Sequence, residues 1–344
     1  MRSLSRRRFM IGAGVITGLA LAPVELGAAW NALDNAANSI AYPGTESPIA
    51  TLGFEGTGAP DVPHVASGLN IYPGLGQVPA TARKIALKLA NVYPDETISY
   101  NQYAAQGLQT PNQADEYERW QGMVDEAEIF CNSMGSVTWA NVMGEMHTRA
   151  LAARGATALT AAKTNSHQVK PIKTLTFCSS PFDADDVYQS KAVKLITEHA
   201  LSGTLTEKFL VKLGTAIGSS KDYSGIKQMI EIAADNTFDQ LPPKMWASQI
   251  AQLGSSNVGM FASSYAGAVN HDTLVMYLRP KNAADDRVVK VAQAAEKMRD
   301  FFTGTFGCKF VSLEMEGASH ADIDKACQCA QFEDLLQAKS GLHI

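Results

Sequence analysis

The chain has 344 residues, of which 46% are hydrophobic and 18% are charged, and its formal net charge is -5. A chain of this length and composition is globular and can bury one large core or two small ones. The acidic balance argues against binding to nucleic acid or to anionic membranes, so we expect no nucleic-acid partner.

The first thirty residues have the pattern of an export signal. A basic start precedes a moderately apolar run over residues 9–21, and the small residues at 27–29 suit a signal-peptidase cut. Residues 5–10, SRRRFM, resemble the twin-arginine export signal. The resemblance implies that the twin-arginine export machinery recognises these residues, and we expect cleavage after Ala29.

Cleavage would remove four arginines and one glutamate, which lowers the formal net charge from -5 to -8. The mature protein is then expected to be periplasmic or secreted. An uncleaved signal that anchors the chain in the membrane is the alternative, although the apolar run is short for a bilayer span.

Five cysteines follow the signal. Cys131 and Cys178 fall in apolar runs and are expected to be buried thiols. Cys308 with either Cys327 or Cys329 is a candidate disulfide in an exported protein, and the spacing leaves the choice open.

The mature chain alternates predicted strands and helices up to residue 178. In chain order we expect a strand at 49–54 with a glycine-rich loop after it, a helix at 79–92, a strand at 97–101, a helix at 115–126, a strand at 127–131, a helix at 137–153 and a strand at 172–178.

Residues 185–265 then show only helical patterns, separated by glycine and proline. The alternation resumes with a strand at 273–278, a helix at 288–302, a strand at 308–314 and a helix at 321–336.

This alternation predicts an α/β fold, with a mostly parallel central sheet and helices on both faces. The all-helical stretch is too long for a single crossover and is predicted to be an inserted lid or cap. The expected divisions are an export signal at 1–29, the N-terminal part of the core at 30–184, the helical lid at 185–265 and the C-terminal part of the core at 266–344.

The stretch CNSMG at residues 131–135 is the strongest chemical signal in the sequence. Ser133 follows a predicted strand and precedes a predicted helix, which is the context of a nucleophile elbow. The usual pattern, G-x-S-x-G, has its first glycine replaced by Cys131. Because the sharp turn requires small residues on both sides of the serine, Cys131 and Gly135 are both acceptable. A serine that only caps a helix is the plainer alternative.

A nucleophilic serine needs a histidine base and a carboxylate that orients the histidine. In a parallel sheet these groups meet at the carboxyl ends of the strands. Asp286 follows the strand at 273–278, with Asp285 beside it as an alternative acid, and His320 follows the strand at 308–314. A second group of candidate acids follows the strand at 172–178, and its members are Asp183, Asp185 and Asp186.

The order Ser, Asp, His, each after a strand and with a helical insertion between the first two, resembles that of α/β-hydrolase fold serine hydrolases such as esterases and lipases. The resemblance runs from Pro48 to the C-terminus. It implies a triad of Ser133, Asp286 and His320.

The resemblance also implies an oxyanion hole with two backbone donors. The N–H of Met134, directly after the serine, is the first donor. The second is expected in the loop after an early strand, which we place in LGFEGTGAP at Thr57, with Phe54 as the alternative if that strand ends earlier.

We therefore predict an exported serine hydrolase that cleaves carboxylic esters of small molecules or lipids through an acyl-enzyme. The alternatives are amide, peptide or non-hydrolytic chemistry on the same scaffold, and a non-catalytic binding protein. No metal-binding spacing occurs in the sequence, so we expect neither metal nor cofactor. Apolar residues of the lid are candidates to line an acyl pocket: Phe209, Leu210, Met229, Ile230, Met245, Trp246 and Met260.

Overall fold

The fold was determined as a computed structural model. The described residues are 51–55, 65–94, 96–103, 110–157, 170–202, 206–219, 224–234, 241 and 243–340. The predicted export signal at 1–29 lies outside them. Among the described residues, no helix combines the length and the apolar character that crossing a bilayer requires.

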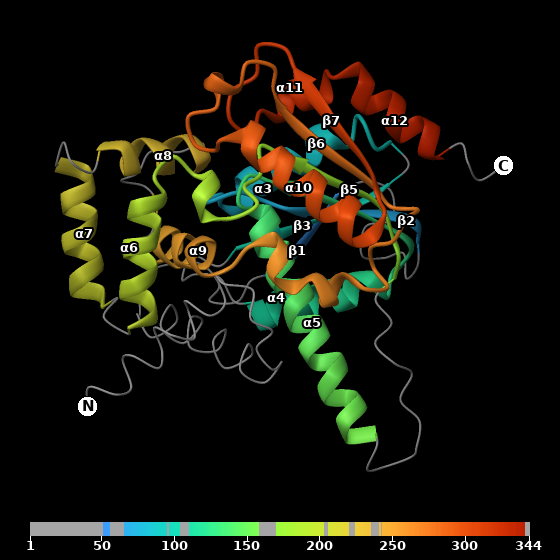
Figure 1. Cartoon of the computed structure of the whole chain (residues 1–344), viewed down its shortest axis with the longest axis horizontal. Helices are drawn as coiled ribbons and strands as arrows, with labels where there is room; N and C mark the ends of the chain where they lie inside the picture. Colours follow the sequence, from blue (N-terminus) through green and yellow to red (C-terminus); the bar gives the residue numbers. More distant parts are fainter. Residues whose placement is uncertain are drawn as a thin grey trace.

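A seven-stranded sheet forms the centre of the molecule (Figure 1). The strands, in chain order, are β1 (Thr51–Glu55), β2 (Val65–Tyr72), β3 (Thr97–Gln102), β4 (Val124–Asn132), β5 (Ile172–Cys178), β6 (Leu274–Pro280) and β7 (Lys309–Met315). Their order across the sheet is β1-β3-β2-β4-β5-β6-β7. Only the edge strand β1 runs antiparallel to its neighbour, so the predicted mostly parallel sheet is confirmed.

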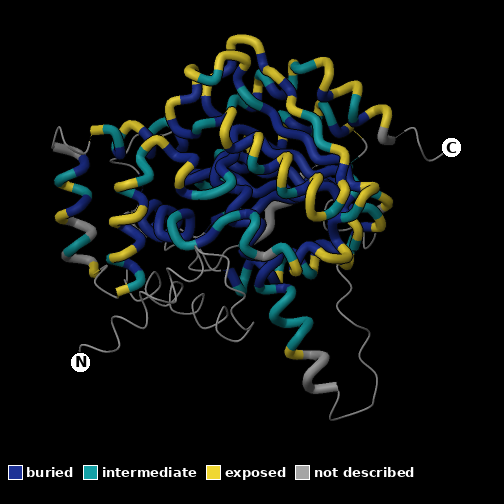
Figure 2. The backbone as a smooth tube through the Cα atoms, in the orientation of Figure 1, coloured by how far each residue is buried: buried dark blue, intermediate teal, exposed yellow. Residues whose placement is uncertain are grey.

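Helices cover both faces of this sheet, as predicted. One face carries α4 (Thr110–Gln121), α5 (Gly135–Thr157) and α10 (Val291–Phe306). The other carries α3 (Pro79–Leu89), α11 (Ile323–Cys327) and α12 (Ala330–Ser340). Residues that alternate along β4 divide between the two cores: Ile129 packs on the first face and Phe130 on the second. The sheet is therefore buried on both sides, as Figure 2 shows.

A helical segment separates β5 from β6 in the chain, and we call residues 190–265 the helical insertion. It consists of α6 (Ser190–Leu201), α7 (Glu207–Ser219), α8 (Ser224–Ala234), α9 (Pro243–Ser255) and the 3-10 helix η4 (Val258–Tyr265). Figure 1 shows α6, α7, α8 and α9 grouped beside the sheet. Of the apolar residues predicted to line an acyl pocket, Met229, Ile230, Met245 and Trp246 are buried in the hydrophobic core on the sheet face that α4, α5 and α10 cover.

One strand was missing from the sequence prediction. β2 lies in the middle of the sheet between β3 and β4, yet it contains Ser67, Gly68 and Asn70, which do not fit an apolar strand pattern. The Asn70 amide is buried and bonds the hydroxyl of Ser99 at 2.9 Å, and it accepts from Asn101 at 2.9 Å. Side-chain hydrogen bonds between strands therefore make this polar strand compatible with a buried position.

A carboxyl group is also buried in the sheet. Glu128 of β4 is buried and accepts a hydrogen bond of 2.9 Å from the hydroxyl of Thr174. Desolvation, with a further contribution from the charge of Glu96, raises the pKa of Glu128 to about 8. The side chain is therefore mostly protonated at neutral pH.

Candidate active site

Ser133 lies at the sharp turn between β4 and α5. Its backbone has φ of 50°, a left-handed conformation that is unusual for a residue with a side chain. The N–H of Ser133 donates to the carbonyl of Cys178, at the end of the neighbouring strand β5, at 2.9 Å. The turn thus presents Ser133 at the carboxyl end of the sheet, where strained backbone conformations are often functional. The residue is only 3% exposed.

The residues two positions before and after the serine, Cys131 and Gly135, differ in whether a side chain fits there. A Cβ atom at Gly135 would lie 2.1 Å from the carbonyl oxygen of Tyr72, which is too close for any side chain. Cys131, by contrast, is fully buried in the core that α4 and α5 cover, where its side chain fills space. Burial also raises the pKa of the Cys131 thiol well above its usual value, so this thiol is held neutral. Glycine is therefore required at position 135, two residues after the serine, and not at position 131, two residues before it.

His320 lies in the loop after β7, and its side chain contacts the serine. Its Nε2 atom is 2.8 Å from Ser133 Oγ. The residue is 7% exposed, so both partners of this contact are shielded from water. The two residues are 187 positions apart in the chain, and the parallel sheet brings them together.

Asp286 follows β6 and the short 3-10 helix η5 (Ala283–Asp285). Its two carboxylate oxygens are 3.0 and 2.9 Å from Nδ1 of His320. Oxygen Oδ1 also accepts the N–H groups of Val288 and Val289 at 2.9 and 2.8 Å, which fixes the carboxylate in place. Because an ionised carboxylate only accepts, Nδ1 of His320 carries the hydrogen, and Nε2 is free to accept from Ser133.

The alternative acids lie elsewhere. Asp285 is exposed and accepts from the Asn282 amide at 3.0 Å. Asp183 caps the short 3-10 helix after β5, and both its oxygens are 2.9 Å from Nζ of Lys297. Among the described carboxylates, Asp286 is the one that bonds His320.

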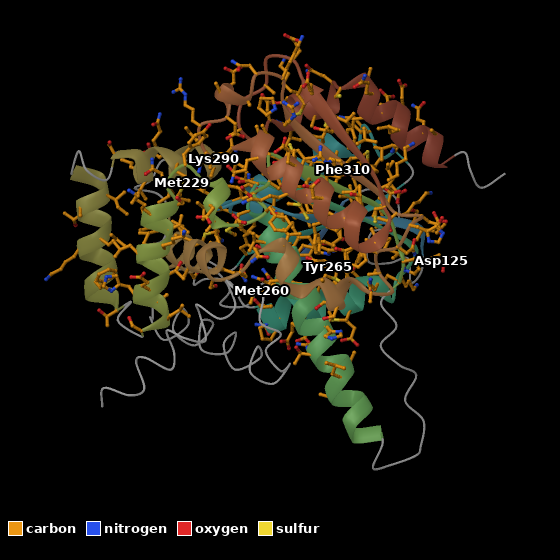
Figure 3. The ribbon with its side chains drawn as sticks, in the orientation of Figure 1. Asp125, Met229, Met260, Tyr265, Lys290 and Phe310 are labelled. Atoms are coloured by element: carbon orange, nitrogen blue, oxygen red, sulfur yellow. The ribbon has the colours of Figure 1, made fainter. Side chains whose placement is uncertain are left out.

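The other aspartates after β5 lie in the 3-10 helix η1 (Ala184–Asp186) and contact the loop that carries Asp286 and the helix α10 that follows it. Asp186 is buried, with desolvation raising its pKa, and it bonds Lys297 on α10 at 2.8 Å. The N–H of Lys290 donates to the carbonyl of Asp186 at 2.7 Å, and its ammonium donates to the carbonyl of Asp185 at 2.8 Å. Figure 3 shows Lys290 at the boundary between the insertion and the sheet. These contacts therefore stabilise the loop that carries Asp286.

The predicted second oxyanion donor, Thr57, lies outside the described residues. The alternative, Phe54, lies in the edge strand β1, with β3 and β2 between it and β4. The loop that adjoins the serine follows β2 instead. A Cβ atom at Gly74 in this loop would be 3.0 Å from Cβ of Ser133. The sequence offered one signal for it, the dipeptide Pro73-Gly74, but we did not predict the strand before it.

We call residues 73–77 the oxyanion loop, and several of its backbone polar groups are held by hydrogen bonds. The carbonyl of Pro73 accepts from the Tyr103 hydroxyl at 2.7 Å. The N–H of Gly74 donates to Oε1 of Gln77, and the N–H of Gly76 donates to Oε1 of Gln249. In the described part of the chain, the N–H of Leu75 has no acceptor, and neither does the N–H of Met134 beside the serine. Among the described residues, two backbone donors therefore have no acceptor: the N–H of the residue after Ser133 and the N–H of the residue after Gly74, whose Cβ position lies 3.0 Å from Cβ of Ser133.

No group of three or more His, Cys, Asp or Glu side chains that could hold a metal ion occurs among the described residues. All five cysteines are described, and none forms a disulfide. Cys308 precedes β7 and Cys327 lies in α11, beyond the opposite end of that strand. Neither candidate pairing, Cys308 with Cys327 or Cys308 with Cys329, therefore occurs in this structure.

The sequence matches no protein-family model and none of the curated proteins compared with it. Solved structures do resemble the fold. A thermostable carboxyl esterase from Bacillus coagulans aligns with a TM-score of 0.52 and 12% identity, over 86% of this chain and 94% of its own. MenH from S. aureus aligns with a TM-score of 0.47 and 11% identity, over 84% and 97% of the two chains. The chain therefore has the α/β-hydrolase fold, with a mostly parallel sheet between helices.

Proposed function

We propose that this protein is a serine hydrolase that cleaves carboxylic esters. The observation that supports the proposal is the continuous hydrogen-bonded chain from Ser133 Oγ through the imidazole of His320 to the carboxylate of Asp286. Each of the three side chains is positioned by a different strand of the sheet, and each is buried. This is the arrangement that converts a serine hydroxyl into a nucleophile.

The reaction begins when Ser133 Oγ attacks the ester carbonyl carbon and Nε2 of His320 takes the hydroxyl proton. Asp286 stabilises the imidazolium that forms and holds the tautomer. The tetrahedral intermediate then expels the alkoxide, which receives the proton from His320. In the second half, water loses a proton to His320 and attacks the acyl-enzyme, so that the carboxylic acid is released and Ser133 Oγ recovers its proton.

The negative oxygen of the tetrahedral intermediate needs donors that are already in place. We assign this role to the N–H groups of Met134 and Leu75. Met134 and Thr57 were both predicted from the sequence; Thr57 lies outside the described residues, and Leu75 is our proposal from the position of its loop. Its support is the position of the oxyanion loop against Ser133 and the N–H of Leu75, which has no acceptor among the described residues.

A serine-reactive fluorophosphonate probe tests the nucleophile. We expect the probe to label the wild-type protein and not Ser133→Ala. Ser136→Ala is the matched control, because Ser136 is also buried, lies three residues later and donates to the backbone carbonyls of Pro181 at 2.7 Å and Ser133 at 3.4 Å instead of bonding His320. Labelling that survives in Ser133→Ala, or loss of labelling in Ser136→Ala alone, would reject the assignment.

Esters of p-nitrophenol with increasing acyl length then test the substrate class. We expect turnover that disappears in Ser133→Ala, with an optimum that reports the size of the acyl site. Probe labelling without turnover of any ester would favour the alternative of another chemistry on this scaffold.

Export through the twin-arginine machinery remains part of the proposal. Its support is the sequence SRRRFM at residues 5–10 and the small residues at 27–29. Replacement of Arg6 and Arg7 by lysine should leave the protein inside the cell, whereas the wild type should appear in the periplasm or medium without residues 1–29. Unchanged export of the double variant would refute this part.

A further inference from the structure

The helical insertion makes a direct hydrogen bond to the oxyanion loop. Oε1 of Gln249, on α9, accepts from the N–H of Gly76 at 2.5 Å. The two residues are 173 positions apart, and Gln249 is fully buried. The insertion therefore contacts the segment that carries the proposed oxyanion donor.

Apolar contacts hold the same point of the loop. Gly76 has φ of 69°, and a Cβ atom there would lie 2.9 Å from Cβ of Ala234 and 3.4 Å from a methyl group of Leu241. Ala234 ends α8, and Leu241 lies between α8 and α9. The insertion thus packs against Gly76 as well as bonding to it.

The bond at Gly76 matters because of its position beside Leu75. The peptide N–H before Leu75 is held by Gln77 within the loop, and the N–H after it is held by Gln249 from the insertion. With both neighbours fixed, the Leu75 peptide has little freedom to rotate. Gln249 therefore limits the direction in which the free N–H of Leu75 points.

The other amide atom of Gln249 makes the side chain costly for stability. Its Nε2 is buried and has no hydrogen-bond partner among the described residues. An unpaired buried donor destabilises the folded protein, and an apolar side chain of similar size would avoid this cost. A role for Oε1 in the active site accounts for a glutamine at this position.

We propose that Gln249 is a positioning residue for the oxyanion hole and that the helical insertion supplies it. The inference rests on the proposed function, since it concerns the same reaction at Ser133. The insertion then takes part in the site: when α9 is displaced, the Leu75 donor is no longer held in position.

The test compares Gln249→Met with wild type on p-nitrophenyl butyrate. Methionine keeps the volume and removes the acceptor, so we expect kcat to fall by about 10- to 100-fold, in the range of a misplaced or weakened oxyanion donor, and KM to change less than about twofold. A trifluoromethyl ketone, which forms a tetrahedral oxyanion on the serine, should bind Gln249→Met more weakly by a similar factor. The melting temperature should change little, because the substitution removes one unpaired buried donor, Nε2 of Gln249, and leaves another, the N–H of Gly76.

Two further variants make the result specific. Gln249→Glu keeps an acceptor oxygen and should recover most of kcat. Gln252→Met is the matched control, because Gln252 is also buried on α9, one turn later, but it bonds Thr110 and Thr138 and not the oxyanion loop. Gln252→Met should keep the wild-type kcat and lose stability instead.

A wild-type kcat in Gln249→Met would overturn the inference, as would an equal fall in kcat in Gln249→Glu or in Gln252→Met. Such a result leaves the proposed function standing as long as Ser133→Ala abolishes turnover and labelling. Activity that persists in Ser133→Ala would reject the proposed function itself.

Discussion

Replacing Gly135 with alanine should damage catalysis although it adds only one methyl group. That methyl would lie 2.1 Å from the carbonyl oxygen of Tyr72 and 3.1 Å from that of Pro73. Ordinary contact begins at about 3.4 Å, so the start of α5 and the end of β2 must separate by more than 1 Å. Both atoms at risk are backbone atoms, which cannot rotate away as a flexible side chain could.

This separation moves Ser133 away from the oxyanion loop. A misplacement of about 1 Å can cost on the order of 100-fold in rate, so we expect kcat for p-nitrophenyl butyrate to fall by about that factor. The crowding should also destabilise the fold by about 1–3 kcal/mol. Steady-state kinetics and the melting temperature measure the two effects.

Gly304→Ala is the matched control. Gly304 lies in α10 and is exposed, and among the described residues no atom beyond its own stretch of helix lies within 4 Å of the position that a Cβ atom would take. Alanine there should stabilise the helix by up to about 1 kcal/mol and leave kcat unchanged. If Gly135→Ala kept the kcat and melting temperature of the wild type, the close packing of α5 on β2 could not be what positions the serine.

Two further predictions concern carboxylates. Asp286→Asn should lower kcat by up to about 10⁴-fold, because the histidine loses the carboxylate that fixes its tautomer and stabilises the imidazolium. Asp285→Asn changes an exposed neighbour and should leave kcat within about twofold of wild type. Equal effects of the two substitutions on ester turnover would contradict the assigned acid. Glu128 has a folded-state pKa of about 8, above its unfolded value of about 4.5, so its contribution to stability is complete below about pH 4.5 and is lost as the pH rises to about 8. The shift corresponds to at most about 5 kcal/mol. Glu128→Gln should reduce the loss of stability between pH 5 and 8 in urea unfolding, and an unchanged pH dependence would show that Glu128 ionises normally.

The three side chains of the candidate site could be chosen from the sequence, because the carboxyl ends of parallel strands meet at one edge of the sheet. Ser133, Asp286 and His320 could each be placed after a strand with a clear apolar pattern. The same rule could not separate Asp286 from Asp183, since both follow strands. The choice between these two acids depends on Lys297 of α10, which pairs with Asp183. The strand pattern does not reveal where Lys297 lies.

The strand pattern could not locate the oxyanion loop, for a physical reason. The strand before it, β2, is stabilised by amide and hydroxyl bonds to β3, so its sequence reads as polar although Asn70 is buried. Without β2, the glycine-rich stretch around Thr57 was the nearest match to an early loop. The bond between Gln249 and Gly76 was equally hidden, because no local pattern relates residues so far apart in the chain.

The packing around the serine also bears on how related sequences should be recognised. A search pattern that demands glycine on both sides of the nucleophile excludes this chain at Cys131, where the fold accepts a side chain. The steric limit lies at Gly135 alone, against the backbone of β2. A pattern that keeps only the second glycine, together with an aspartate and a histidine after later strands, would retrieve divergent members of this fold that the stricter pattern discards.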